Sequence, residues 1–347
     1  YRANYVSAAK DPMVYLVSHT WADRFEKGRR RATIEAYSNC DSVLLYNDMS
    51  NEKVTYLGRK KNNGTGTHFM WENRDIRYNV LRAVGYYKGK AVAEDILVLN
   101  GLEQAPHFGI LYQDTKPLLK GEDGYNYLYR INCGGDDFTD SFGQLWMQDN
   151  TNYSRSWAAS FNELNPYLAS QRTTNDPIRG SRDWKLFQYF RFGRHQLEYN
   201  FPVADGMYRI EFYFTEPWHG TGGSASADCE GLRIFDVAVN DSVVLDDLDI
   251  WAESGHDGAC KKVVYAIVKG GLLKIHFPEV KAGQALISGI AIASANSDSK
   301  PTLFPASDWN WEKASKEVME KTPKELLPED KNALHHLLRQ AAYAYHA

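Results

Sequence analysis

The chain has 347 residues, which is enough for two or three domains that each bury a hydrophobic core. Hydrophobic residues make up 43%, charged residues 24%, and the net charge is only −4, a composition that lacks the domain-wide basic face of a nucleic-acid-binding protein. No apolar run approaches the ~18 residues that a membrane-spanning helix needs. We therefore expect neither nucleic acid nor membrane as a partner.

The first third of the chain, residues 12–118, has the pattern of short strands separated by turns. Asn-Asp, Asn-Asn-Gly and Lys-Gly sequences separate stretches rich in β-branched and aromatic residues. This spacing predicts an all-β sandwich of immunoglobulin type, followed by a linker over 119–127. The expected strands cover 13–18, 32–37, 42–46, 78–84 and 96–99.

A larger β-rich unit follows over residues 128–296, and we expect a second sandwich with long loops at one end. The segment 269–271, Lys-Gly-Gly, lies between two predicted strands and indicates a compact hairpin. The clearest predicted strands cover 209–214, 234–239, 262–268, 272–277 and 286–292.

Residues 297–347 change character and predict a linker with a short helical tail. Apolar side chains there recur at the spacing of one helix face. They are Leu334, Leu337, Leu338, Ala341, Ala342 and Tyr345.

The most informative segment is 214–223, FTEPWHGTGG, which reads as a strand followed by a glycine-rich loop. The loop carries two adjacent flat side chains, Trp218 and His219. Flat rings held on a rigid sandwich suit the apolar face of a sugar, and neighbouring amides and carboxylates suit its hydroxyls. The alternative is that both rings fold onto the sandwich edge as ordinary packing.

The cysteines and acidic clusters give no pattern of a resident metal or cofactor. The four cysteines lack CxxC or CxxH spacing, which argues against structural zinc. Cys40 and Cys133 are expected to be buried thiols, whereas a disulfide between Cys229 and Cys260 is left open. The segment 246–249, DDLD, lacks the alternation and glycine of a calcium loop, and we interpret it as a solvated turn.

Three segments in the first third resemble the immunoglobulin-like domain that follows the catalytic barrel in glycoside hydrolase family 2, in particular its β-galactosidase-type enzymes. They are 12–21 (PMVYLVSHTW), 37–42 (YSNCDS) and 81–86 (LRAVGY). The resemblance implies that residues 1–11 are a remnant of the preceding domain. It also implies a parent enzyme that acts on glycans outside the cytoplasm, in the periplasm or the extracellular space.

Segments of the second unit resemble the malectin domain, a carbohydrate-binding β-sandwich of jelly-roll type. They are 131–135 (INCGG), 235–240 (FDVAVN), 248–251 (LDIW) and 255–256 (GH). The resemblance implies sugar contacts at Trp157, Phe192, Trp218 and His219, with Trp184 and Tyr189 as possible neighbours. The family's late aspartate falls near Gln284, an amide that could bond a hydroxyl in its place.

The resemblances imply a non-catalytic region that binds an oligo- or polysaccharide and accompanies the catalytic barrel of the same polypeptide. The alternative is a pair of architectural sandwiches without a ligand. Family 2 enzymes use an Asn-Glu pair and a second carboxylate about 5 Å away. Asn51-Glu52 and Asn162-Glu163 occur here, but neither follows a barrel strand, so we expect no catalytic site in this chain.

Overall fold

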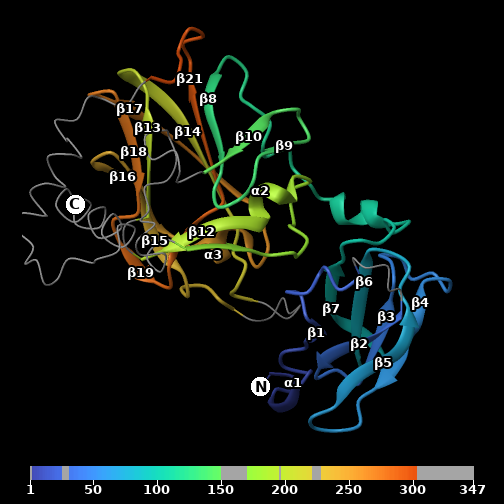
Figure 1. The fold of residues 1–347 in the computed structure, drawn as a ribbon. Helices are drawn as coiled ribbons and strands as arrows, with labels where there is room; N and C mark the ends of the chain where they lie inside the picture. Colours follow the sequence, from blue (N-terminus) through green and yellow to red (C-terminus); the bar gives the residue numbers. More distant parts are fainter. Residues whose placement is uncertain (1, 26–30, 150–169, 195–196, 221–227, 303–347) are drawn as a thin grey trace, which may run out of the picture.

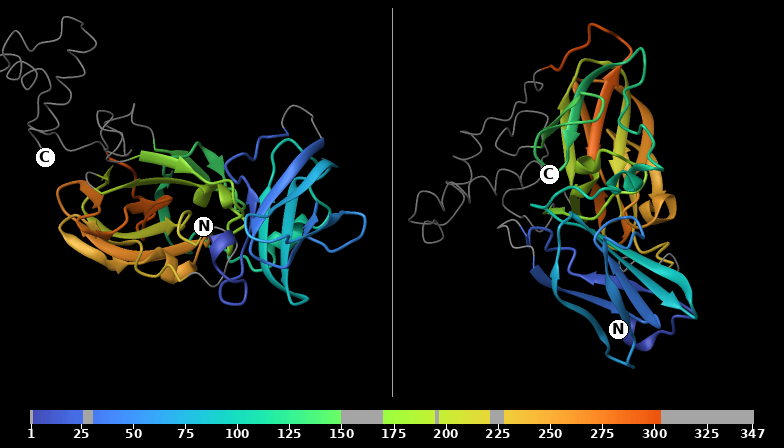
Figure 2. Two further views of the ribbon diagram at one scale, coloured as in Figure 1. Left: turned by 90° about the horizontal axis from the view of Figure 1, so that it is seen from below. Right: turned by 90° about the vertical axis from the view of Figure 1, so that its right-hand side faces the viewer.

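The computed structural model describes residues 2–25, 31–149, 170–194, 197–220 and 228–302. Within these ranges the chain is mainly β-strand and builds two sandwiches that lie side by side (Figures 1 and 2). The predicted all-β fold is therefore confirmed, while the helix predicted in the tail lies outside the described residues. Over the same ranges, no helix is both long and apolar enough to cross a membrane.

The N-terminal sandwich packs the sheet β1–β2–β5 against the sheet β4–β3–β6–β7, and a short helix α1 (Arg2–Tyr5) precedes it. In β2 the alternate residues Ile34 and Ala36 are buried, opposite Trp71 and Phe69 of β5. This period of two gives each sheet one apolar face, and the two apolar faces form the core. The strands are β1 (Val14–Val17), β2 (Arg31–Ser38), β3 (Ser42–Tyr46), β4 (Tyr56–Lys61), β5 (His68–Asp75), β6 (Val80–Tyr87) and β7 (Lys90–Val98).

The second sandwich is larger and is built from three sheets. One has the order β17–β14–β21–β8–β10–β9, a second the order β13–β18–β15–β16, and a third the order β11–β12–β20. Short helices α2 (Trp184–Gln188) and α3 (Ile250–Ser254) lie in its connections. Its strands are β8 (Asn126–Asn132), β9 (Phe138–Thr139), β10 (Leu145–Gln148), β11 (Ser170–Thr173), β12 (Tyr189–Gly193), β13 (Glu198–Pro202), β14 (Gly206–Phe214), β15 (Ile234–Val239), β16 (Ser242–Leu248), β17 (Cys260–Val268), β18 (Leu272–His276), β19 (Val280–Ala282), β20 (Ala285–Ile287) and β21 (Gly289–Ser294).

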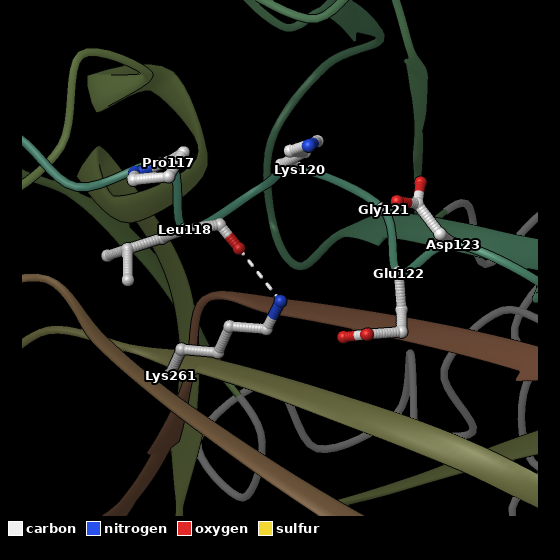
Figure 3. Close-up of a pocket in the computed structure, with 7 residues that line it drawn as sticks. All are labelled: Pro117, Leu118, Lys120, Gly121, Glu122, Asp123 and Lys261. Carbon is white, nitrogen blue, oxygen red and sulfur yellow. Dashed lines mark hydrogen bonds between the residues drawn. The ribbon is translucent and has the colours of Figure 1, made fainter.

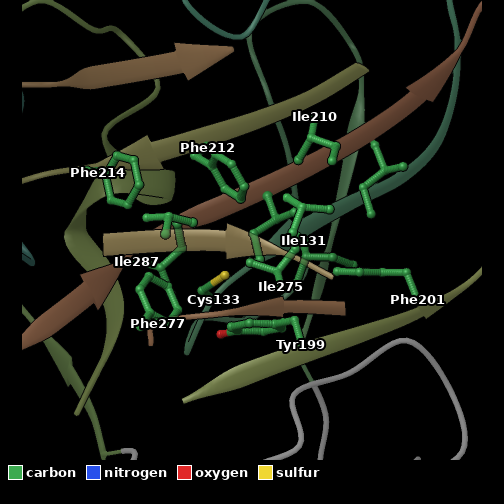
Figure 4. Packing of buried hydrophobic residues seen from close by; sticks show 14 of the residues in the cluster. Ile131, Cys133, Tyr199, Phe201, Ile210, Phe212, Phe214, Ile275, Phe277 and Ile287 are labelled. Carbon is green, nitrogen blue, oxygen red and sulfur yellow. The ribbon is translucent and has the colours of Figure 1, made fainter. Parts of the chain in front are cut away.

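The core of the second sandwich is rich in aromatic and branched side chains from facing sheets. Ile210, Phe212 and Phe214 alternate along β14 and point toward Tyr199 and Ile275 of the opposite sheet (Figure 4). All five side chains are buried. Burial of this much apolar surface holds the sheets rigidly enough to fix the loops at their edges.

The hairpin predicted at 269–271 is wrong. β17 pairs with β14, whereas β18 pairs with β13 and β15 in another sheet. Val268 and Leu273 join one core cluster, so the turn carries the chain from one sheet to another around that core. The stretch predicted as one strand over 286–292 is likewise divided between β20 and β21, which pair in different sheets.

The two sandwiches meet along a seam beside the short 3₁₀ helix η1 (Phe108–Tyr112). Trp184 at the start of α2 packs against Phe108 and Tyr112, with ring centroids 5.7 and 5.1 Å apart. The His19 ring, in the connection after β1, hydrogen-bonds through Nδ1 with the Asp176 carboxylate of the second sandwich. The seam therefore combines aromatic packing with a charged contact.

All four cysteines are free and buried. Burial raises the pKa of the Cys40 and Cys133 thiols, as expected for inert core residues. The Cys229–Cys260 disulfide that the sequence left open is not formed, and Cys260 begins strand β17 rather than lying in a loop.

Candidate functional site

The Trp218–His219 loop leaves the end of β14 and places its tryptophan on two phenylalanine rings. Trp218 is 38% exposed. Its ring lies edge-to-face with Phe192 and Phe190, at centroid distances of 5.0 and 5.5 Å. The structure thus brings together two residues, Phe192 and Trp218, that are separated in the sequence by the strands β13 and β14.

Strand β12 supplies both phenylalanines from one face. Phe190 is fully buried in the core, and Phe192, two residues further on, is half-buried against the same core. Arg191 points to the other face, where it forms a bidentate ion pair with buried Asp149. Core packing on one face and an ion pair on the other therefore fix the position of the Phe192 ring.

A buried carboxylate holds the backbone of the loop. Glu216 accepts hydrogen bonds from the backbone N–H groups of Trp218 and His219 at 3.0 and 3.1 Å. Arg233 completes this arrangement by donating to Glu216 Oε2 at 2.5 Å and to Oε1 at 3.2 Å. Glu216 is 0% exposed and Arg233 1% exposed, so this ion pair is shielded from solvent.

Arg233 also connects the loop to Gln284. Its guanidinium donates to the Gln284 backbone carbonyl at 2.5 Å, and its central carbon lies 4.9 Å from the centre of the Trp218 ring. Gln284 is half-buried in the connection between β19 and β20. Arg233 therefore contacts Trp218 and the Gln284 backbone directly, while Phe192 is joined to it through the Trp218 ring and His219 through Glu216.

The loop rests against the connection between α3 and β17. Gly220 has φ +90°, and a Cβ placed there would lie 2.9 Å from Trp251 Nε1 and 3.0 Å from His256 Cβ. The Glu216 carbonyl also accepts from the Asp257 N–H at 2.9 Å. A glycine is required here both by the backbone angle and by the close approach.

The remaining candidates fall elsewhere. Trp157 and the pair Asn162-Glu163 lie outside the described residues. Trp184, a possible neighbour of the sugar contacts, packs at the seam, as described above. Glu52 is exposed, and its nearest ionic partner is His107, with a 3.7 Å separation.

Sequence reasoning missed the two residues that organise the site, Glu216 and Arg233. Glu216 stands two positions before Trp218, so its proximity to the loop was visible. Arg233 lies 17 residues after Glu216 and directly before strand β15. Nothing in the neighbouring sequence distinguishes it from a surface arginine. Its role depends entirely on the folded chain.

A hollow, separate from the Trp218 site, lies beside the segment that leads into β8. It is lined by residues 117–118, 120–123 and Lys261 (Figure 3). The Lys261 ammonium donates to the Leu118 carbonyl at 2.8 Å and pairs with Glu211 at 2.9 Å. The Lys261 ammonium therefore already has partners within the chain, and its hydrogen bond to Leu118 holds that segment against β17.

Solved structures to which the chain is similar include a bacterial and a plant protein. Bacteroides uniformis beta-glucuronidase 2, covalently bound to cyclophellitol-6-carboxylate aziridine, is 22% identical, covers 81% of this chain and 30% of its own, and gives a TM-score of 0.40. The plant receptor-like kinase FER is 13% identical, with 86% and 85% coverage and a TM-score of 0.41.

Curated relatives match the second sandwich. Malectin of Danio rerio is 26% identical over 150 residues, which are 43% of this chain and 47% of the relative. Malectin-B of Xenopus laevis is 24% identical over 149 residues, with 43% and 48% coverage. The aligned region spans about half the length of these relatives. The family model of the malectin domain matches residues 127–296, and the second sandwich is therefore a malectin domain.

Proposed function

We propose that the malectin domain binds a glycan at the surface formed by Trp218 and Phe192. The observation that carries this proposal is the half-exposed Trp218. Its ring packs against Phe192, and its backbone N–H donates to buried Glu216. The Arg233 guanidinium lies over the indole ring, and 38% of Trp218 is exposed, which is the surface on which we place the sugar ring. Holding the ring in place before binding reduces the entropy lost on association.

The chemistry around the indole suits a neutral or weakly polar sugar. Two charged groups beside the ring in the described part of the chain, Glu216 and Arg233, are buried and paired with each other. His219 and Gln284 are half-buried and offer an imidazole and an amide to hydroxyl groups. Binding should be weak, between about micromolar and millimolar, because sugar hydroxyls exchange water for protein hydrogen bonds.

We further propose that the chain is a non-catalytic C-terminal region of a family 2 glycoside hydrolase resembling β-galactosidases, acting in the periplasm or outside the cell. The sequence resemblances over 12–21, 37–42 and 81–86 support this. In this proposal residues 12–118 are the immunoglobulin-like domain, 128–296 the glycan-binding domain, and the partner is a catalytic barrel of the same polypeptide. A module that holds substrate nearby raises its effective concentration at the barrel.

The aromatic seam favours a second candidate, an architectural pair of sandwiches. The Trp184 ring packs against Phe108 and Tyr112 at the seam between the two units. This packing requires no ligand. A spacer of this kind would position the barrel and bind no sugar.

A glycan array followed by calorimetric titration of the full chain separates the two candidates. We expect selective binding that weakens about 30-fold in Trp218→Ala, as for loss of ~2 kcal/mol at a central contact. Trp21→Ala is the matched control, since Trp21 is 63% exposed on the other sandwich. Absence of binding to both galactosides and glucosides, or equal losses in the two variants, would favour the architectural candidate.

A further inference from the structure

A cluster of ionisable side chains lies where the seam meets the malectin domain. His19 contacts two carboxylates: Nε2 lies 2.8 Å from Asp95 Oδ2, and Nδ1 contacts Asp176 Oδ1. His19 therefore bridges Asp95 of the N-terminal sandwich and Asp176 of the malectin domain.

Two further ionisable groups, His256 and Asp257, lie beside Asp176. One donor atom from each of these three residues falls within 4.8 Å of the other two. Asp176 comes from the connection between β11 and α2, and the other two come from the connection between α3 and β17. Two loops distant in sequence thus converge on one point.

The second of these loops is tightly built. Asp257 adopts φ +49°, in the left-handed region. A Cβ on the following Gly258 would lie 2.1 Å from the Ser254 carbonyl oxygen, so only glycine fits. The Asp257 N–H is engaged with Glu216, and the His256 carbonyl accepts from Arg179 at 2.8 Å. The donor atoms are therefore held in place before any ligand arrives.

The cluster contains buried polar atoms that lack partners. Asp257 is 7% exposed, and its Oδ2 pairs with His256 Nε2 at 2.9 Å. Asp257 Oδ1 and His256 Nδ1 are buried, and neither has a hydrogen-bond partner within the described part of the chain. Unsatisfied buried atoms of this kind are uncommon in native proteins, and a bound ion is one of the partners that can satisfy them.

The cluster is also rich in acidic groups. Asp95, Asp176 and Asp257 bring three carboxyl groups to this point, with the imidazoles of His19 and His256 beside them. A bound cation would give the unpartnered Asp257 Oδ1 a partner.

We propose that Asp176, His256 and Asp257 form a binding site for a divalent transition-metal ion of the Zn²⁺ type. An imidazole nitrogen with carboxylate oxygens is a donor set that zinc accepts, whereas calcium takes six to eight oxygens. His256 and Asp257 also contact the base of the Trp218 loop, through Gly220 and the Glu216 carbonyl. The ion therefore stabilises the loop that carries the exposed indole.

Calorimetric titration of the full chain, stripped of metal with EDTA and free of affinity tags, tests this site with Zn²⁺ as the probe. We expect one ion per chain, a raised midpoint of thermal unfolding, and at least about tenfold weaker binding in Asp257→Asn. Asp246→Asn is the matched control, because Asp246 belongs to a second acidic group, with Asp236 and Asp247, that is partly exposed. Its affinity should equal that of the unmodified chain.

Absence of saturable Zn²⁺ binding would overturn the proposal. So would unchanged affinity in Asp257→Asn, or loss of binding in Asp246→Asn, which would place the ion on the exposed turn. Circular dichroism checks that Asp257→Asn folds. If it does not, His256→Gln replaces it under the same criteria, since that imidazole is nearer the surface. Sugar titration with and without Zn²⁺ distinguishes failure of this site from failure of the proposed glycan site.

Discussion

The interiors of the two sandwiches are held together by different interactions. Among the described residues, the N-terminal core is a cluster of apolar side chains such as Leu45, Phe69 and Trp71. The malectin domain adds ion pairs deep in the fold, including Arg191 with Asp149 and Arg233 with Glu216. Apolar burial stabilises without specifying direction, whereas a bidentate ion pair fixes the orientation of both partners. The N-terminal sandwich also has a buried directional contact, His19 with Asp95, but it lies at the seam, whereas in the malectin domain such pairs lie beside the candidate site.

The largest effect is expected from breaking one of these pairs. Arg233→Met leaves the Glu216 carboxylate buried without its cation, and we expect the free energy of unfolding to fall by about 3–5 kcal/mol. Urea denaturation followed by tryptophan fluorescence measures this loss. Glu216→Gln combined with Arg233→Met should recover much of the stability but not the sugar affinity. A single variant as stable as the parent would show that the pair does not carry the difference between the sandwiches.

Shortening a side chain in the apolar core of the N-terminal sandwich tests the other half of this comparison. Leu45 is fully buried in β3, and Leu45→Ala should lower the free energy of unfolding by about 2–5 kcal/mol through the cavity it leaves. Because the substitution lies in the N-terminal sandwich, we expect unchanged sugar affinity in the same titration. A change in affinity would mean that the seam couples the two units.

A glycine substitution separates backbone strain from crowding. Gly220→Ala should cost about 1–3 kcal/mol, since φ is +90° and the new methyl group would meet Trp251 and His256. Gly89, in the turn between β6 and β7, has φ +78° and open space around it. Gly89→Ala thus reports strain alone and should be milder by the same denaturation assay. Equal losses would indicate that the loop yields to the added methyl group.

The smallest effect concerns acid sensitivity and needs a pH series. Burial opposes ionisation of Glu211, but hydrogen bonds from Tyr213 and the charge of Lys261 lower its pKa below the ordinary 4.5. Its contribution to stability is therefore complete above pH 4.5 and is lost as the pH falls through the lowered value. Glu211→Gln should flatten the stability profile in that window. Exposed Glu72→Gln is the control, and an unchanged profile in Glu211→Gln would count against this account.

The sequence by itself determined the all-β class and the position of most of the clearest strands. β3 and β15 have the predicted limits, β1 and β2 differ from theirs by one residue at each end, and β17 and β18 differ by two residues and one residue at one end. Alternation of apolar and polar residues is a local property, so it can be read without knowing which strands pair. The loop with Trp218 and His219 could be predicted for a similar reason, because a glycine-rich segment after an apolar strand is also a local feature of the sequence.

Only the tertiary structure decided which segments meet. The short Lys-Gly-Gly turn predicts a hairpin, but β17 and β18 join different sheets because each buries its apolar face in the shared core. The convergence of Phe192 with Trp218, and of Asp176 with His256 and Asp257, depends on contacts between distant loops. Arg233 carries no local signal of its role, since an ion pair is defined by its partner and by the exclusion of water around both.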